Sequence, residues 1–273
     1  MEYTIRAFGM QELGQRSNQE DSIYPPLGAD ARGVRLFIVC DGMGGHERGE
    51  VASRVVCETM SQYILSHPDE SDYDSLLQAS IDAAYTALDL RDDGADRKMG
   101  TTLALLMLHT GGATVAHIGD SRVYQLRPAD GPVPARVLFK TRDHSLVNDL
   151  IRLGELTEEE AKTFPQRNVI TRAMMPHQER PSRADVAHIS DVRPGDYFFL
   201  CSDGVLENME DSQLLSLLTR EEQTDEEKLE MLRQATRNNR DNHSAYIVHL
   251  VVDGGNADSE SSVFKSIKRF FSM

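Results

Sequence analysis

Three short apolar runs in this chain end at an aspartate. In chain order they are residues 36–40 with Asp41, residues 113–118 with Asp120, and residues 197–201 with Asp203. A fourth acid, Asp241, precedes the last long apolar run. Apolar runs bounded by turn residues are typical of buried strands. Strands that each end at a carboxylate are therefore expected to bring these acids together in space.

Clustered carboxylates constrain the chemistry of such a site. Several ionised carboxylates held close together repel one another, so the arrangement needs cations. Oxygen ligands without paired Cys or His spacing favour a hard ion, Mg²⁺ or Mn²⁺. Gly42, directly after Asp41, lets the backbone approach closely, so its carbonyl is a further candidate ligand. The alternative is a set of β-turns, since Asp-Gly is a common turn pair. The recurrence at three runs favours the metal interpretation.

The hydrophobic pattern predicts an α+β protein with antiparallel sheets. The middle strands follow one another through short turns at Gly111-Gly112 and Gly119-Asp120, which is a hairpin pattern. Expected strands cover residues 36–40, 101–109, 113–118, 122–126, 185–189, 197–201 and 245–252. Expected helices cover residues 50–66, 73–90, 145–153, 157–163, 211–218 and 225–238.

Two of these expected helices carry apolar stripes at a spacing of three to four residues. The stripe in the helix over 50–66 comprises Val51, Val55, Thr59 and Tyr63. The stripe in the helix over 73–90 comprises Leu77, Ile81, Ala84 and Leu88. Each stripe is expected to face the protein core.

Charge and cysteine content exclude several classes of protein. The formal net charge is −15, so binding to nucleic acid or to anionic lipid is disfavoured. No apolar run approaches a membrane span, the N-terminus lacks a signal pattern, and three cysteines form no disulfide framework. A cytoplasmic location is expected. A cysteine phosphatase is excluded because no Arg follows a Cys at six residues, and a Walker loop is absent.

Arg16 stands close to two acids, Glu20 and Asp21, near the start of the chain. An Arg beside a metal–carboxylate cluster is suited to holding a phosphate through two hydrogen bonds. The alternative is a surface loop with a local ion pair, which contributes little to stability.

These segments together resemble the metal-dependent protein phosphatases of the type 2C family in its bacterial form, over about residues 5–252. The matching segments stand in the family's order. They are residues 16–21 (Arg-Ser-Asn-Gln-Glu-Asp), 41–46 (Asp-Gly-Met-Gly-Gly-His), 100–102 (Gly-Thr-Thr), 118–122 (Ile-Gly-Asp-Ser-Arg), 143–145 (Asp-His-Ser), 167–172 (Arg-Asn-Val-Ile-Thr-Arg), 201–204 (Cys-Ser-Asp-Gly) and 241–242 (Asp-Asn).

The resemblance implies a four-layer α/β/β/α sandwich with a binuclear metal centre, and it implies a role for each candidate residue. By analogy, Asp41 bridges both ions, the Gly42 carbonyl binds one, and Asp203 and Asp241 bind the other. Glu20 and Asp21 act largely through metal-bound water, and Asp120 is a ligand of a third, weaker metal with Asp203 shared. Arg16 holds the substrate phosphate, and a water activated by the two ions attacks phosphorus without a phosphoenzyme intermediate.

The chain also departs from the family pattern. Met43 stands where animal members place a His proposed as general acid, and Met cannot donate a proton. His46 is a weak alternative donor. Glu207 replaces an Asp that many members carry, which puts the geometry of the third metal in doubt. His243-Ser244 replaces the usual apolar or hydroxyl residues after Asp241-Asn242.

The expected function is hydrolysis of phosphoserine and phosphothreonine in proteins, opposing a Ser/Thr kinase by family analogy. The alternatives are a pseudophosphatase that binds phosphoproteins and a phosphatase for a small metabolite. The presence of Asp41, Asp203 and Asp241 favours an active enzyme.

The expected catalytic domain is 1–252, with a flap at about 142–183. Residues 253–273 are expected to form a flexible spacer and a short amphipathic, basic and aromatic tail. That tail suits docking to a partner better than binding to a membrane, or it has no such role.

Overall fold

The strands form two antiparallel sheets. The structure, a computed structural model, describes residues 3–29, 33–44, 48–92, 94 and 99–252. Sheet A contains, in spatial order, β1 (Tyr3–Glu12), β11 (His243–Val252), β10 (Tyr197–Cys201), β7 (Arg122–Arg127) and β8 (Arg136–Lys140). Sheet B contains β2 (Asp21–Tyr24), β3 (Leu36–Met43), β5 (Leu103–His109), β6 (Gly112–Ile118) and β9 (Asp185–Ile189), and the short β4 (Gly100–Thr101) pairs with β3. The expected α+β class with two antiparallel sheets is confirmed.

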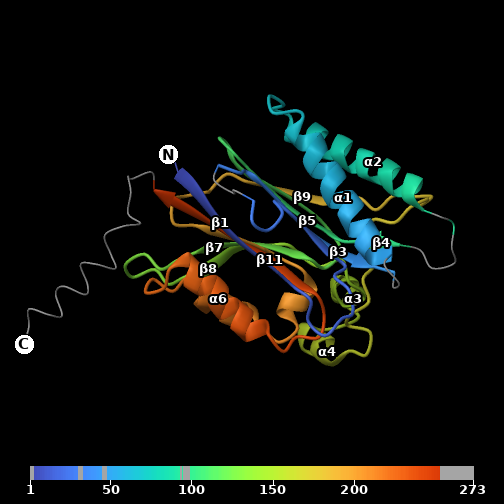
Figure 1. Cartoon of the computed structure of the whole chain (residues 1–273). Helices are drawn as coiled ribbons and strands as arrows, with labels where there is room; N and C mark the ends of the chain where they lie inside the picture. The colour runs from blue at the N-terminus through green and yellow to red at the C-terminus, as the bar shows by residue number, and fades with distance from the viewer. Residues whose placement is uncertain (1–2, 30–32, 45–47, 93, 95–98, 253–273) are drawn as a thin grey trace, which may run out of the picture.

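Helices cover the outer face of each sheet, so the molecule has four layers (Figure 1). The helices α1 (Arg48–Leu65) and α2 (Tyr73–Arg91) pack on sheet B. The helices α5 (Asp211–Leu218) and α6 (Asp225–Thr236) pack on sheet A. A third apolar cluster lies between the two sheets. Both faces of each sheet are therefore buried, which explains why antiparallel strands read as continuous apolar runs.

Strand β3 illustrates how the layers follow from the alternation of side chains. Leu36, Ile38 and Cys40 face the helices α1 and α2, whereas Phe37 and Val39 face sheet A. All five side chains are buried. The three cysteines, Cys40, Cys57 and Cys201, are free and buried, as expected for core residues.

The apolar stripe predicted for α1 is wrong by about one residue. The buried face comprises Ala52, Ser53, Val56, Cys57, Met60, Ser61 and Ile64. Val51, Val55 and Tyr63 lie at its margin and are only partly buried. The reason is that α1 packs against both sheet B and α2, so its buried face is wider than a single stripe. The stripe predicted for α2 is confirmed, since its four residues are all buried.

Three strands were missed by the sequence pattern. β1 and β8 are edge strands with mostly half-buried side chains, and β2 has only four residues. Edge strands lack the continuous apolar run or strict alternation on which the prediction depends. The run predicted as one strand over 101–109 is divided at Thr102 into β4 and β5.

Segment 142–183 carries the helices α3 (Leu146–Leu153) and α4 (Glu158–Thr163), close to the expected ranges. The side chains of Ser145 and Thr157 cap their N-termini, and Gly154 ends α3 in the left-handed conformation. The expected spacer and tail over 253–273 lie outside the described residues. In the part of the chain that the structure describes, no helix has the length and apolarity needed to cross a bilayer.

A buried ion pair joins β7 to the turn before β10. Arg127 Nε donates to Asp196 Oδ1 at 2.7 Å, and Arg127 Nη1 lies 3.0 Å from Asp191 Oδ2. The side chain of Asp196 is 1% exposed, whereas that of Asp191 is 57% exposed. Removal of one partner from a buried ion pair leaves a charge without compensation, whereas an exposed pair contributes little.

We expect Asp196→Ala to lower the free energy of unfolding by roughly 3–5 kcal/mol, because it removes the buried partner of Arg127. The control is Asp191→Ala, which should lower the free energy of unfolding far less, because that carboxylate is solvated. Urea unfolding of both variants measures the difference. Equal losses in the two variants would contradict the assignment of Asp196 as the stabilising partner.

Candidate active site

Five aspartates from both sheets converge at one end of the sandwich. Asp41 lies in β3 and pairs in register with Asp21, the first residue of β2. Asp120 lies in the turn between β6 and β7, Asp203 begins a 3₁₀ helix (Asp203–Leu206) just after β10, and Asp241 precedes β11. The charges of Asp21, Asp120 and Asp203 act on Asp41, and that of Asp241 acts on Asp21 and Asp203. We call these five residues the acidic cluster.

Burial and mutual repulsion raise the pKa values within the acidic cluster. Burial is the main cause and raises the pKa of Asp21 to about 7, with Asp203 and Asp241 adding repulsion. Burial and repulsion by Asp203 and Asp143 raise the pKa of Asp120 to about 7. The pKa of Asp41 is raised well above its ordinary value by the same two causes. Without cations, the cluster would therefore retain protons at neutral pH.

The donor set of the cluster fits hard divalent cations. Its side chains present oxygen ligands alone, which is the preference of Mg²⁺ and Mn²⁺. One oxygen, Asp21 Oδ1, is buried and has no hydrogen bond of standard geometry among the described residues; the Ser244 hydroxyl, which also lacks one, acts on Asp21 and lowers its pKa. The other oxygen of Asp21 accepts a hydrogen bond from Ser202 Oγ at 2.9 Å. A buried carboxylate oxygen without a partner is costly unless a cation or a proton binds it.

Backbone and hydroxyl groups hold Asp41 in place. Thr102 Oγ1 accepts the Asp41 N–H at 2.9 Å, and Thr101 Oγ1 donates to the Asp41 carbonyl at 2.9 Å. Thr102 Oγ1 also lies 2.7 Å from Ser121 Oγ, next to Asp120. The two threonines of the Gly-Thr-Thr segment therefore connect Asp41 of sheet B with the turn that carries Asp120.

Close backbone packing explains why position 42 is a glycine. A Cβ atom on Gly42 would lie 2.1 Å from the carbonyl oxygen of Gly49 and 2.5 Å from that of Glu20. The Gly42 N–H donates to the Glu20 carbonyl at 3.1 Å. The end of β3, the start of α1 and the loop before β2 therefore meet beside Asp41, and no larger residue fits there.

Arg16 is paired with a member of the cluster. Its Nη2 lies 2.6 Å from Asp241 Oδ2, and the two side chains are 54% and 38% exposed. The charges of Glu20 and Asp41 also act on Arg16. The predicted phosphate-binding residue is thus at the solvent-facing edge of the cluster, where it remains accessible to a ligand.

Asn242 forms hydrogen bonds to the loop that carries Arg16 and Glu20. Its Oδ1 accepts the Glu20 N–H at 2.8 Å, and its Nδ2 donates to the carbonyls of Leu13 and Asn18 at 2.8 and 3.1 Å. Asn242 is 3% exposed. The Asp-Asn pair at 241–242 therefore combines a cluster carboxylate with a side chain that positions the opposite loop.

Two departures from the family pattern are clarified by the structure. Glu207 Oε2 accepts the backbone N–H of Arg240 at 2.6 Å, so this side chain holds the loop before Asp241. His243 is buried and its Nδ1 lies 2.9 Å from the Asp241 carbonyl oxygen. His46, the weak candidate for a proton donor, lies outside the described residues.

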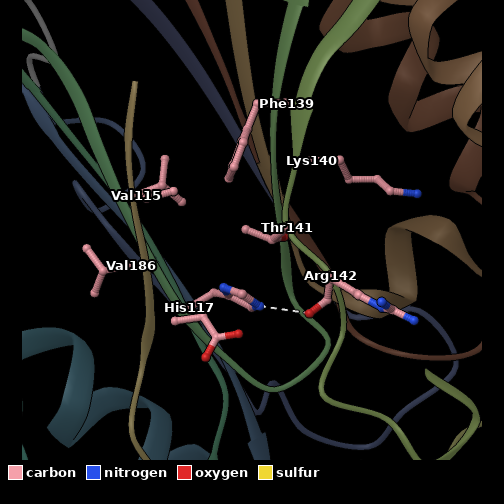
Figure 2. Close-up of a pocket in the computed structure, with 9 residues that line it drawn as sticks. Val115, His117, Phe139, Lys140, Thr141, Arg142 and Val186 are labelled. Carbon is pink, nitrogen blue, oxygen red and sulfur yellow. Dashed lines mark hydrogen bonds between the residues drawn. The ribbon is translucent and has the colours of Figure 1, made fainter. Parts of the chain in front are cut away.

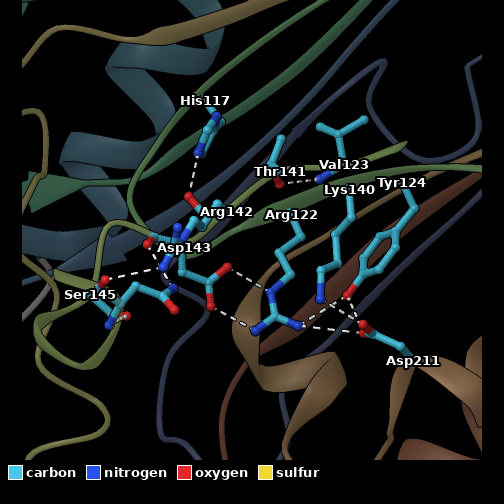
Figure 3. A network of polar contacts seen from close by, with 11 residues as sticks. His117, Arg122, Val123, Tyr124, Lys140, Thr141, Arg142, Asp143, Ser145 and Asp211 are labelled. Carbon is cyan, nitrogen blue, oxygen red and sulfur yellow. Dashed lines mark hydrogen bonds and ion pairs between the residues drawn. The ribbon is translucent and has the colours of Figure 1, made fainter. Parts of the chain in front are cut away.

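A polar network lies next to Asp120 and includes Arg122 and Asp143, which stand in the family segments but have no role predicted from the sequence. Arg122 Nε and Nη2 donate to the two carboxylate oxygens of Asp143 at 2.7 and 2.6 Å (Figure 3). Tyr124 Oη accepts from Arg122 Nη1 at 3.0 Å and donates to Asp211 Oδ1 at 2.9 Å. Lys140 Nζ donates to Asp211 Oδ2 at 2.6 Å. The network joins the Asp120 turn to the start of segment 142–183 and to α5.

A hollow of about 140 Å³ lies between β6, β8 and β9 (Figure 2). Its lining includes Val115, His117, Phe139, Arg142 and Val186, and none of its lining residues belongs to the acidic cluster. His117 Nε2 lies 2.9 Å from the Arg142 carbonyl oxygen, which forms part of the wall. The acidic cluster is therefore at a separate place, at the open end of the sandwich.

Comparison with known proteins identifies a family. Residues 9–245 match the family model described as protein phosphatase 2C. The chain is 33% identical over 243 residues to a putative protein phosphatase 2C-type from Streptococcus pyogenes, covering 87% of this chain and 94% of that protein. It is 36% identical over 211 residues to the serine/threonine protein phosphatase PstP of Mycobacterium tuberculosis, covering 74% of this chain and 36% of that protein.

Solved structures agree with the sequence comparison. The crystal structure of the Mycobacterium tuberculosis serine/threonine phosphatase PstP superposes with a TM-score of 0.76 and 32% identity, covering 91% of this chain and 100% of that one. The catalytic domain of PstP in complex with two manganese ions superposes with a TM-score of 0.72 and 30% identity, covering 92% and 100%. The resemblance to the bacterial type 2C phosphatases is confirmed. The chain therefore belongs to the protein phosphatase 2C family and is a metal-dependent protein phosphatase.

Proposed function

We propose that this protein hydrolyses phosphoserine and phosphothreonine in proteins, with two Mg²⁺ or Mn²⁺ ions bound at the acidic cluster. The observation that carries the proposal is the convergence of five aspartates from two sheets, with one buried oxygen of Asp21 left without a hydrogen bond of standard geometry. Bacterial relatives named as serine/threonine phosphatases support the choice of substrate.

The proposed ligand roles follow the family resemblance and suit the geometry. Asp41 would contact both ions, because it lies among the other carboxylates. The proposed further ligands are the Gly42 carbonyl for one ion, Asp203 and Asp241 for the other, Glu20 and Asp21 through water, and Asp120 with Asp203 for a weaker third ion. The domain proposed to carry this site is 1–252, with segment 142–183 as its flap.

In the proposed reaction, the ions would supply the nucleophile and the side chains would hold the phosphate. When bound, two neighbouring cations supply a water of lowered pKa as nucleophile and neutralise phosphoryl oxygens. Arg16, at the exposed edge of the cluster, would hold the phosphate through two charge-assisted hydrogen bonds. Met43 cannot donate a proton, so the departing serine or threonine oxygen would take its proton from water or from another residue.

The proposed substrates are phosphoproteins, including a Ser/Thr kinase and its targets, in the cytoplasm, a reducing compartment that suits three free cysteines. The direct test is phosphate release from phosphothreonine peptides with Mn²⁺, with Mg²⁺ and with a chelator. Release with either ion and none with the chelator is expected. Release that persists in the chelator would refute the proposed mechanism.

We expect Asp41→Asn and Asp203→Asn each to reduce kcat/KM by at least about a hundredfold at saturating Mn²⁺, because each removes a proposed ligand charge. The fold should persist, as circular dichroism and urea unfolding can check. The matched control is Asp191→Asn, an exposed acid that pairs with Arg127 and Arg193 and is not a member of the cluster. Activity within about tenfold of wild type in either cluster variant would exclude that residue as an essential ligand.

We expect Arg16→Ala to raise KM for the peptide on the order of tenfold or more. A charge-assisted contact to phosphate is worth about 1.5–3 kcal/mol, and alanine removes it. Arg54→Ala is the control, because Arg54 is similarly exposed and pairs with Glu50 on α1. Steady-state kinetics that are the same for both variants would show that Arg16 serves only its ion pair with Asp241.

We expect stabilisation by Mn²⁺ to grow as pH rises. In the metal-free protein the pKa of Asp21 is raised to about 7, from near 3.9 in an unfolded chain. The folded form therefore binds more protons between these values, and its stability falls as pH rises through that interval. Bound Mn²⁺ replaces those protons.

The measurement is the thermal midpoint with Mn²⁺ and with chelator at pH 5 and pH 8. The shift caused by Mn²⁺ should be larger at pH 8, and Asp21→Asn should reduce that difference. A shift that is independent of pH would contradict ion binding at the raised-pKa carboxylates.

A further inference from the structure

Both polar backbone groups of Gly119 bond to one distant residue. The His144 N–H donates to the Gly119 carbonyl at 2.9 Å, and the Gly119 N–H donates to His144 Nδ1 at 3.1 Å. His144 is 7% exposed. Gly119 has a φ of +99°, and Asp120 of the acidic cluster follows it directly. His144 therefore holds the turn that carries Asp120 through two hydrogen bonds to the Gly119 backbone.

These contacts determine the tautomer of His144. A ring nitrogen that accepts an N–H carries no proton, so Nδ1 is unprotonated and the ring proton is on Nε2. Nε2 lies 3.1 Å from Asp185 Oδ2, an acceptor suited to that proton, and 3.2 Å from Arg172 Nη1, which can only donate. Because Nδ1 accepts the Gly119 N–H, the proton of the neutral ring is on Nε2, and the contact with Arg172 Nη1 is then not a hydrogen bond. Arg172 Nη1 donates to the other oxygen, Asp185 Oδ1, at 2.8 Å. The imidazole thus connects Gly119 on one side with the Asp185–Arg172 pair on the other.

A metal-binding role for this group is disfavoured. Ligand atoms of His117, His144 and Asp185 lie within 4.8 Å of one another, a spacing that could suit a cation. A metal on His144 Nε2 would require a proton on Nδ1, which would then face the Gly119 N–H, donor against donor. Arg172 already supplies a positive charge to Asp185. The hydrogen bonds of His144 therefore favour a positioning role over metal ligation.

The same residue and the nearby Leu146 bind residues 169–171 within segment 142–183. The Thr171 N–H donates to the His144 carbonyl at 2.7 Å, and the Leu146 N–H donates to the Val169 carbonyl at 2.9 Å. Asp143, one residue earlier, holds Arg122 through two hydrogen bonds. Residues 143–146 thus connect both sides of the Asp120 turn with residues 169–171.

We propose that His144 is a positioning residue that sets the Asp120 carboxylate for ion binding, with its Nδ1 lone pair on Gly119 as the essential contact. Asp185 and Arg172 orient the ring, because Asp185 accepts the Nε2 proton. This inference rests on the proposed function only through the assignment of Asp120 as a ligand of the weaker ion.

The test uses variants that each keep one half of the imidazole. Asn places an acceptor oxygen near the position of Nδ1, whereas Gln places its amide near Nε2 and offers nothing to Gly119. Manganese binding without substrate is followed by electron paramagnetic resonance of free Mn²⁺. In His144→Gln the dissociation constant of the weakest site should rise about fivefold or more, with tighter sites within twofold. His144→Asn should stay within twofold of wild type at every site.

Nitrogen-15 NMR of the metal-free wild-type protein supplies a readout that does not depend on a variant folding. The His144 signals, assigned by their loss in His144→Asn, should show an unprotonated Nδ1 and a protonated Nε2. A protonated Nδ1 would overturn the proposal, as would equal Mn²⁺ affinities in wild type and His144→Gln, or equal damage in the Asn and Gln variants. The proposal would also be overturned if Asp120→Asn weakened none of the Mn²⁺ sites found in the wild-type protein.

Failure of the proposed function has a different signature. Wild-type protein that binds Mn²⁺ in a His144-dependent way yet releases no phosphate from any peptide would contradict the phosphatase assignment alone. Active protein with unchanged ion binding in His144→Gln would contradict the positioning role alone.

Discussion

Ionised carboxylates that are held close together repel one another, and five aspartates of this protein are held in that relation. Burial and mutual repulsion raise the pKa values of Asp21, Asp41, Asp120 and Asp203. Arg16 interacts with Asp241 and Asp41 of the cluster, and Arg122 acts on Asp120. Their two charges do not balance five carboxylates, so protons or divalent cations must supply the rest.

The scaffold meets this constraint with neutral groups. Threonine hydroxyls hold the backbone of Asp41, an asparagine side chain holds the loop of Glu20, and His144 holds the turn of Asp120. Neutral donors and acceptors fix the positions of the carboxylates without pairing with their charges. The four layers support this arrangement, because strands buried on both faces end together at one edge where the polar residues gather.

Structural features that depend on neighbouring residues could be predicted from the sequence, whereas those that depend on distant residues could not. The buried strands and the α2 stripe were predicted because apolar runs and helical spacing are properties of neighbouring residues. The strands β1, β2 and β8 were missed because short or edge strands owe their pairing to partners elsewhere in the chain. The α1 stripe was misplaced because the width of a buried face depends on the neighbouring helix and sheet.

The sequence by itself determined the class of fold, the acids that end the strands and the family to which the chain belongs, since these depend on residue type and order. Only the tertiary structure showed that one buried oxygen of Asp21 lacks a hydrogen bond of standard geometry, that Arg16 pairs with Asp241, and that His144 hydrogen-bonds to Gly119. Each of these depends on two groups distant in sequence. Their distance is set by how strands and loops pack, which no local pattern of residues records.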